Sequence, residues 1–443
     1  MNQHGGDQGG GAQVGGAQDG AAQDGAARDA AAGRRAIVVG AGITGVAAAI
    51  GLRRMGWQVT LVDRAPPGDR GAASFGNGGI LARCSIVPVP VPGLLAKAPR
   101  MLLDPNEPLY LRWSHVPRMA PFLLRYLSYG RERHVRRIAA ALAGLTGDSV
   151  EEHTALAAGT GAERFIRTGD YGHLFRNRAQ YEKDALGNAI RAEHGFVPEE
   201  VDRAGLLERD PALGEAWTFG AIYPGHGWIL NPGAYVAALA EHFAREGGVI
   251  RRAEVAALDG EGKVTLAGGA TMRADRVVLA AGAWSARLAA GLGLRLPMES
   301  ERGYHLALKN PASRPAHPWM VSEVKAVTTP MDFGVRLAGI VEFGGLEAGP
   351  SAAPPRLLRA AAARIWPGLE WEAEEEWMGH RPVLADSLPA IGEIPGAPAV
   401  IAAFGGQHVG LTAGPRIGRL AAGIAAGQAL NEDLSACAPG RFR

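Results

Sequence analysis

Ala36-Ile37-Val38-Val39-Gly40-Ala41-Gly42-Ile43-Thr44-Gly45 is the stretch that decides the fold of this 443-residue chain. Its first residues are small or β-branched, which predicts a buried strand of a parallel sheet that runs into a glycine turn. After Ile43 apolar residues recur at helical spacing, and Gly56 is typical of a helix C-terminus. Residues 59–63 then form a second apolar run that ends in Asp63. This order of strand, helix and strand predicts a β-α-β unit.

The glycine spacing within this unit matches G-x-G-x-x-G, the pattern of dinucleotide-binding turns. Gly40 permits the tight turn, Gly42 lets the backbone approach a pyrophosphate, and Gly45 lets the helix pack closely on the strand. The positive end of the helix then faces the phosphates, and Asp63 can accept hydrogen bonds from ribose hydroxyls. NAD and FAD are both compatible with the motif. We therefore expect a dinucleotide at Gly40, Ala41, Gly42, Ile43, Thr44, Gly45 and Asp63.

The composition excludes several classes of protein. Hydrophobic residues make up 47% and charged residues 20%, which is too polar for a bundle of membrane spans. The net charge of +2 gives no electrostatic footprint for nucleic acid, so we expect small-molecule partners. Cys84 and Cys437 lie far apart in no metal-ligand spacing, so we expect no disulfide framework, no metal site and a reducing cytoplasm. Residues 1–33 are rich in Gly, Ala, Gln and Asp, which predicts a disordered tail without a secretory signal.

The regular alternation of strand and helix is interrupted in the middle of the chain. Residues 91–227 are rich in Pro, Arg, Leu and aromatic residues, whereas residues 276–280 and 399–403 are again short apolar runs that lead into glycines. We therefore expect an α/β protein with a Rossmann-like dinucleotide-binding domain interleaved with an α+β substrate domain. The first would comprise residues 34–90, 228–298 and 377–432. The second, residues 91–227 and 299–376, would be built on a mixed or antiparallel sheet.

Three further segments carry a family resemblance: residues 71–79 (GAASFGNGG), 277–285 (VVLAAGAWS) and 404–415 (FGGQHVGLTAGP). They resemble the D-amino-acid oxidase superfamily of FAD-dependent oxidoreductases, and within it bacterial D-amino-acid dehydrogenases of the small-subunit type. The resemblance implies that the first segment wraps the isoalloxazine end of FAD and that the second is a further dinucleotide contact. The third begins the C-terminal helix, whose positive end faces the flavin pyrimidine and raises its reduction potential.

The resemblance also implies which further residues contact the cofactor. No cysteine lies where some relatives attach flavin covalently, so the FAD is expected to be non-covalent. The additional residues expected at the cofactor are Arg64, Ser74, Asn77, Gly78, Val255, Ala281, Gly282, Trp284, Gly406, Gly410, Leu411 and Thr412.

Oxidation at a carbon that bears an amine and a carboxylate requires a hydride acceptor and a clamp for the carboxylate. Arginine suits the clamp because its planar fork binds carboxylates bidentately, and Arg381 stands in the place of the family's Leu-Arg-Pro-type motif. Arg336 lies on an alternating strand and faces either the pocket or solvent. The resemblance places Tyr304 near the substrate, where it could bind the carboxylate, with His305 on the opposite face of the strand; a tyrosine packed in the core is the alternative. His408 either sets the proton balance of the amine or caps the helix.

The resemblance implies oxidative deamination of a D-amino acid, in which hydride passes from the α-carbon to flavin N5 and the imino acid hydrolyses to a 2-oxo acid. Electrons would pass to a quinone or a carrier protein. Residues 76–79 and 301–305 depart from typical dehydrogenases of this kind, so D-hydroxyproline-like and sarcosine-like substrates are alternatives. An oxidase that uses oxygen, a tailoring or tRNA-modifying partner, and a flavin-binding protein without turnover are further alternatives.

Residues 109–138 interleave apolar and aromatic side chains with arginines. A basic amphipathic segment of this kind can lie on an anionic membrane surface. Because family dehydrogenases pass electrons to membrane quinones, we expect a cytoplasmic protein with peripheral contact to the inner face of the cell membrane. The alternative is a helix that covers the substrate domain.

Overall fold

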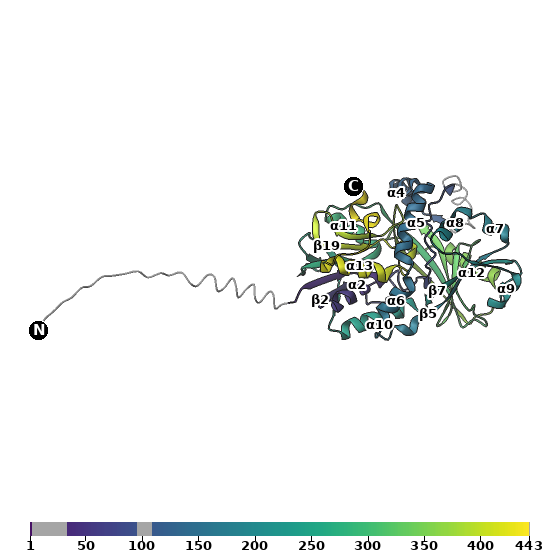
Figure 1. The fold of residues 1–443 in the computed structure, drawn as a ribbon, viewed down its shortest axis with the longest axis horizontal. Coiled ribbons are helices and arrows are strands. Elements are labelled where there is room, and N and C mark those ends of the chain that lie inside the picture. The colour runs from purple at the N-terminus through teal and green to yellow at the C-terminus, as the bar shows by residue number, and fades with distance from the viewer. Residues whose placement is uncertain (2–32, 95–108, 443) are drawn as a thin grey trace.

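Two large sheets lie side by side in the computed structural model, which describes residues 1, 33–94 and 109–442 (Figure 1). The six-stranded sheet, with β2 (Gln58–Asp63) and β19 (Ala397–Phe404), is on the left of the view. The ten-stranded sheet, with β5 (Ile166–Phe175) and β7 (Phe219–Ile229), is on the right. The expected α/β class is confirmed. Apart from Met1 and Gly33, the expected disordered tail lies outside the described residues.

The six-stranded sheet has the order β18-β19-β12-β1-β2-β8 and contains the predicted β-α-β unit, β1, α2 (Ile43–Arg54) and β2. Its other strands are β1 (Arg35–Val39), β8 (Val249–Arg252), β12 (Arg276–Leu279) and β18 (Ala390–Ile394). All neighbouring strands pair in parallel except β18, which runs antiparallel to β19. β1 is buried on both faces, because Ala36 and Val38 join one core and Ile37 and Val39 join another.

Helices cover one face of this sheet, and a small sheet covers the other. The helices besides α2 are α5 (Glu132–Thr146), α6 (Ser149–Ala157), α10 (Pro232–Arg245) and α13 (Gly414–Ala426). α13 approaches α2 closely because Gly418 has no side chain, and a Cβ there would lie 2.6 Å from the Cβ of Ala47. The opposite face carries α11 (Ser285–Gly291), β9 (Val255–Leu258), β10 (Lys263–Leu266) and β11 (Thr271–Arg273).

The ten-stranded sheet is mixed, with most of its neighbouring strands antiparallel. Its remaining strands are β3 (Ile80–Leu81), β4 (Leu109–Leu111), β6 (Glu199–Asp202), β13 (Met298–Lys309), β14 (Trp319–Val321), β15 (Ala326–Met331), β16 (Gly334–Phe343) and β17 (Ala373–Leu384). α12 (Ala353–Ile365) covers one face, where Leu306 and Leu337 join the same core as Leu358. The chain between β5 and β7 contains α7 (Arg178–Glu182), α8 (Ala185–Glu193) and α9 (Arg203–Arg209).

The arginine-rich segment forms α4 (Val116–Ser128) and part of α5. The aromatic face of α4 is buried, because Phe122 and Tyr126 join the same core as Phe343 of β16. Leu124 stays 73% exposed on the other side of the helix. The side chains of Leu109 and Trp113 lie outside the described residues. In the part of the chain that the structure describes, no helix has the length and apolar character needed to cross a membrane.

The two sheets divide the chain differently from the expected domain limits. β3 lies within 34–90 but pairs with β7 of the ten-stranded sheet. β17 crosses the expected limit at residue 377 and pairs along its whole length with β13. α5 and α6, from 91–227, are part of the core of the six-stranded sheet. Composition along the chain does not reveal which strand a segment pairs with, so it cannot place such limits.

Candidate active site

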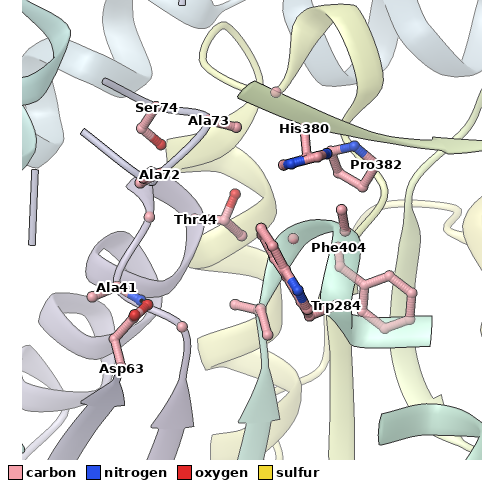
Figure 2. Close-up of a pocket in the computed structure, with 18 of the residues that line it drawn as sticks. Ala41, Thr44, Asp63, Ala72, Ala73, Ser74, Trp284, His380, Pro382 and Phe404 are labelled. Atoms are coloured by element: carbon pink, nitrogen blue, oxygen red, sulfur yellow. Dashed lines mark hydrogen bonds between the residues drawn. The ribbon is translucent and has the colours of Figure 1, made fainter. Parts of the chain in front are cut away.

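A cavity of about 440 Å³ opens where the parallel strands of the six-stranded sheet end (Figure 2). The segments after β1, β2, β8, β12 and β19 line it, and β17 of the ten-stranded sheet contributes residues 377 and 379–382. In open α/β sheets ligands bind at this edge, and the volume is ordinary for a small-molecule site. Figure 2 shows Ala41, Thr44, Asp63 and Ser74 on one side and Trp284, His380 and Phe404 on the other.

The glycine turn brings bare backbone to the cavity. Gly40 has a φ of +108°, and a Cβ there would lie 2.3 Å from the carbonyl oxygen of Ala280. A Cβ on Gly45 would lie 1.8 Å from the carbonyl oxygen of Gly40, so α2 can approach β1 only because Gly45 has no side chain. The first turn of α2 therefore opens into the cavity with N–H groups that have no intrahelical acceptor. This arrangement suits a phosphate group.

Asp63 and Ser74 fix the backbone around this turn. Oδ2 of Asp63 accepts a hydrogen bond from the N–H of Ala41 at 2.7 Å, and Oδ1 accepts one from Ala65 at 3.0 Å. The hydroxyl oxygen of Ser74 accepts a hydrogen bond from the N–H of Ile43 at 3.1 Å. These hydrogen bonds connect the loop 71–79 and the end of β2 to the glycine turn. Both side chains also line the cavity.

An aromatic stack forms the opposite wall. The guanidinium carbon of Arg64 lies 3.9 Å from the ring centroid of Trp284, and the ring of His380 meets Trp284 edge-on at 5.5 Å. Nδ1 of His380 is 2.8 Å from the hydroxyl oxygen of Ser300. Burial, with the nearby positive charge of Arg302, lowers the pKa of His380 to about 4. His380 is therefore neutral near pH 7, and it was not singled out in the sequence.

Most of the residues expected at the cofactor line the cavity. They are Gly40, Ala41, Gly42, Ile43, Thr44, Asp63, Arg64, Ser74, Asn77, Val255, Ala281, Gly282, Trp284, Gly406, Gly410 and Leu411. Gly45 lies beneath the turn instead. Gly78 does not line the cavity, and a Cβ there would be 2.9 Å from Val327. Thr412 points away from it, and its hydroxyl donates to the carbonyl of Ile80 at 2.9 Å.

Arg381 of β17 lines the cavity and contacts Glu301, which also holds His408; neither Glu301 nor His408 lines the cavity itself. Arg381 donates to Oε1 of Glu301 at 3.1 Å, and Nε2 of His408 lies 2.6 Å from the same oxygen. Glu301 is 2% exposed, and burial alone would raise its carboxyl pKa. His408 and Arg381 outweigh burial and lower that pKa, so the carboxylate is charged. The guanidinium of Arg381 lies against Gly303, where a Cβ would come within 2.4 Å of it.

The expected orientations of Tyr304 and His305 are reversed. Tyr304 is buried on the α12 face of the sheet, where its hydroxyl donates to Glu342 at 2.5 Å. His305 faces the cavity side, donates from Nδ1 to the carbonyl of Gly76 at 3.0 Å and stacks on Trp377 at 5.1 Å. The physical reason is the period of two along β13: Tyr304 alternates in phase with the core residue Leu306, whereas His305 does not. That pattern is visible in the sequence.

Arg336 faces neither the open cavity nor solvent. It is 3% exposed, and one guanidinium nitrogen donates to the carbonyls of Phe75 at 3.0 Å and Asn77 at 2.7 Å. Burial lowers the pKa of Arg336 to about 9, so it is still charged near pH 7. Thr329 donates to Gly78 at 2.6 Å in the same way. The ten-stranded sheet thus holds the loop 71–79 by its backbone carbonyls.

Trp377 closes the cavity beside this loop. Its Nε1–H donates to the carbonyl of Arg70 at 2.7 Å, and a Cβ on Gly76 or Gly379 would collide with its ring. The sequence reasoning missed Trp377 and Glu301 as parts of the site. Both lie on the same face of the sheet as Arg381, which strand register could have indicated. Within the described residues no group of His, Cys, Asp and Glu side chains could hold a metal ion.

Comparisons with known proteins agree on one family. A family model described as "FAD dependent oxidoreductase" matches residues 35–424. A D-amino-acid oxidase of Bradyrhizobium diazoefficiens is 37% identical over 420 residues, covering 93% of this chain and 99% of that protein. A D-amino acid dehydrogenase of Paramagnetospirillum magneticum is 30% identical over 378 residues, covering 82% and 88%. The crystal structure of glycine oxidase from Geobacillus kaustophilus is similar in fold, with a TM-score of 0.69 and 22% identity over 92% of this chain and 99% of that one.

Proposed function

This chain belongs to the family of FAD-dependent oxidoreductases, and we propose that it oxidises a D-amino acid at the carbon that bears the amine and the carboxylate. The observation that carries the proposal is Arg381, whose guanidinium faces the same cavity as the glycine turn. The choice of a D-amino acid rests on the names of the two relatives, one an oxidase and one a dehydrogenase.

The residues around the cavity suit FAD. Gly42 and the first turn of α2 offer backbone N–H groups to a pyrophosphate, and Asp63 offers a carboxylate to a ribose. When bound, FAD supplies the acceptor for the hydride of the substrate. Cys84 and Cys437 are both buried and neither lines the cavity, which supports non-covalent binding.

Arg381 is proposed to bind the substrate carboxylate. Its guanidinium has a planar fork with five donors, of which Glu301 takes one, so the remaining donors can hold a second carboxylate bidentately. Glu301 and Gly303 set the position of that fork. His408, held by the same carboxylate, is proposed to exchange a proton with the substrate amine, which must be neutral when hydride leaves. These contacts orient the α-carbon and shield it from water.

Anaerobic loss of the visible flavin absorbance tests the proposal. The purified protein is mixed with D-amino acids, their L-enantiomers, D-hydroxyproline, sarcosine and glycine in the absence of oxygen. Bleaching by D-amino acids but not by L-enantiomers is the expected result. Bleaching by cyclic or N-methylated substrates alone would replace the proposed substrate class, and no bleaching of a protein that holds FAD would overturn the assignment of the cavity.

Arg381→Lys tests the clamp. A lysine keeps the charge but loses the fork, and a charge-assisted hydrogen bond contributes about 1.5–3 kcal/mol, so KM should rise roughly 10-fold to 150-fold. Arg359→Lys is the matched control, because Arg359 pairs with Glu374 at a surface site that does not line the cavity. An unchanged KM for Arg381→Lys would remove this residue from the carboxylate site.

We also propose an electron acceptor outside the protein, a quinone or a carrier protein, and a peripheral membrane contact at α4. Leu124, Arg118 and Arg125 are exposed residues of this helix, a combination that suits an anionic surface. The aromatic face of α4 is buried in the protein, so only the opposite side of the helix is available for such a contact. Sedimentation with anionic vesicles at low salt, reversed by high salt, is expected. Equal sedimentation with neutral vesicles, or no sedimentation with anionic vesicles, would contradict the membrane contact. Reoxidation of the reduced flavin by oxygen alone would identify the protein as an oxidase.

A further inference from the structure

A buried histidine reaches the cavity through the backbone. His153 of α6 is fully buried, and its Nε2 lies 2.9 Å from the carbonyl oxygen of Leu411. Its Nδ1 lies 2.9 Å from the hydroxyl of Tyr235 of α10, which is also fully buried. Leu411 lines the cavity, just after the turn η4 (Gln407–Val409). Three segments far apart in the sequence thus form one hydrogen-bonded chain that ends at a residue of the cavity wall.

The direction of this chain follows from the chemistry of its members. A carbonyl oxygen only accepts, so Nε2 of His153 carries a hydrogen and donates to Leu411. Burial lowers the pKa of His153 to about 4, so the ring is neutral near pH 7 and Nδ1 has no hydrogen. Nδ1 therefore accepts from the hydroxyl of Tyr235. The backbone oxygen of His153 is 3.5 Å from that hydroxyl and competes weakly.

The carbonyl at the end of the chain belongs to a residue of the cavity wall, although its oxygen is directed at His153. Its oxygen carries a partial negative charge, and it also accepts from the N–H of Gly414 at 3.2 Å, at the start of α13. The imidazole N–H of His153 compensates part of that charge in a buried environment, where hydrogen bonds are electrostatically stronger. Donation to the carbonyl also polarises the peptide group that joins Leu411 to Thr412, so its N–H end becomes more positive. Both effects make the potential at this wall less negative.

We propose that His153 and Tyr235 are positioning residues that act through the backbone of Leu411 to raise the reduction potential of FAD bound in this cavity. The proposal rests on the proposed function, because it requires FAD in the cavity. Reduction adds negative charge to the cofactor, so a wall whose carbonyl is compensated stabilises the reduced form relative to the oxidised form. Tyr235 acts one step further away, by holding the ring and the tautomer that donates to Leu411.

The experiment is a reductive titration of the holoprotein against a reference dye, which gives the midpoint potential without turnover. His153→Leu removes the donor and should shift the equilibrium about tenfold toward oxidised FAD, the value of one typical hydrogen bond, or ~30 mV for a two-electron couple. Tyr235→Phe removes one hydroxyl and should shift it in the same direction by a smaller factor. His153→Gln restores an N–H donor of similar reach and should recover most of the wild-type potential.

Tyr171→Phe is the matched control, because Tyr171 is a buried tyrosine that does not line the cavity, and its potential should equal that of the wild type. An unshifted potential in His153→Leu and Tyr235→Phe, with FAD bound, would overturn the relay and leave the proposed function intact. If His153→Leu does not fold, Tyr235→Phe decides alone: a potential equal to that of the wild type overturns the proposal. A wild-type protein that holds no FAD would overturn the proposed function as well.

Discussion

Gly45→Ala is the sharpest test of the cofactor turn. The added methyl carbon would lie 1.8 Å from the carbonyl oxygen of Gly40, and real Cβ contacts are essentially never shorter than 3.0 Å. Gly40 is itself packed closely against the neighbouring strand end, because a Cβ there would lie 2.3 Å from the carbonyl oxygen of Ala280. The first turn of α2 must therefore withdraw from β1 by more than an ångström, and its N–H groups leave the phosphate position.

The magnitude follows from the cost of overpacking. Extra methyl groups in close-packed interiors cost about 1–3 kcal/mol when the backbone must shift. The FAD-free protein can relax by moving α2, but binding the pyrophosphate requires the original position, so the same energy is lost from FAD binding. We expect the dissociation constant for FAD to rise roughly 5-fold to 150-fold.

Fluorescence of released flavin during serial dilution measures this dissociation constant. Gly144→Ala is the matched control, since Gly144 lies within α5 and a Cβ there meets no atom within 4 Å. That variant should bind FAD as the wild type does and be as stable or slightly more stable, because alanine is the better helix former. FAD binding by Gly45→Ala within twofold of the wild type would refute the argument that this glycine sets the distance between helix and strand.

Three further predictions concern single side chains. Asp63→Ala removes the acceptor for the N–H of Ala41 and should weaken FAD retention roughly tenfold; the dilution assay measures it, and wild-type retention would contradict it. Burial raises the pKa of Cys84 to about 12, so a thiol reagent should label it only as fast as the protein unfolds; rapid labelling of native protein would be contrary. Burial lowers the pKa of His226 from 6.5 to about 4. Below pH 6.5 the unfolded chain therefore binds a proton that the folded protein does not, so the free energy of unfolding should decrease as the pH falls, by ~2 kcal/mol at pH 5. Urea titrations at several pH values measure this decrease, which should be smaller in His226→Gln.

The cofactor half of the site could be predicted from the sequence because its determinants are contiguous. The strand 36–39, the glycine spacing and the acid at residue 63 lie within one β-α-β unit, whose chain connections are short. Gly40 and Gly45 are needed for backbone approaches that occur within this unit or against the adjacent strand end at Ala280. The local sequence therefore determines nearly all of the geometry of the cofactor turn. The position of Asp63 at the cavity could be predicted because it depends only on where β2 ends.

The substrate half was harder because its determinants are set by pairing between distant strands. Glu301 meets Arg381 across 80 residues of chain, and only the register of β13 with β17 brings them opposite one another. The orientation of Tyr304 is a different kind of miss. The apolar alternation through Leu306 and Leu308 already assigned even-numbered residues of that strand to the core, and weighting it above a family expectation would have turned Tyr304 inward.

Arginine illustrates why residue type alone could not assign the roles on this sheet. A guanidinium binds a substrate carboxylate and backbone carbonyls with the same donors, so Arg336 and Arg381 were equivalent candidates by chemistry. They differ in what lies above them. Arg336 sits under the loop 71–79 and uses its donors on Phe75 and Asn77, whereas Arg381 sits beside Gly303, where the absence of a side chain leaves its fork facing the cavity. The loop held by Arg336 also carries Ser74, which holds the glycine turn, so Arg336 supports the cofactor wall from the same sheet that presents Arg381 to the substrate.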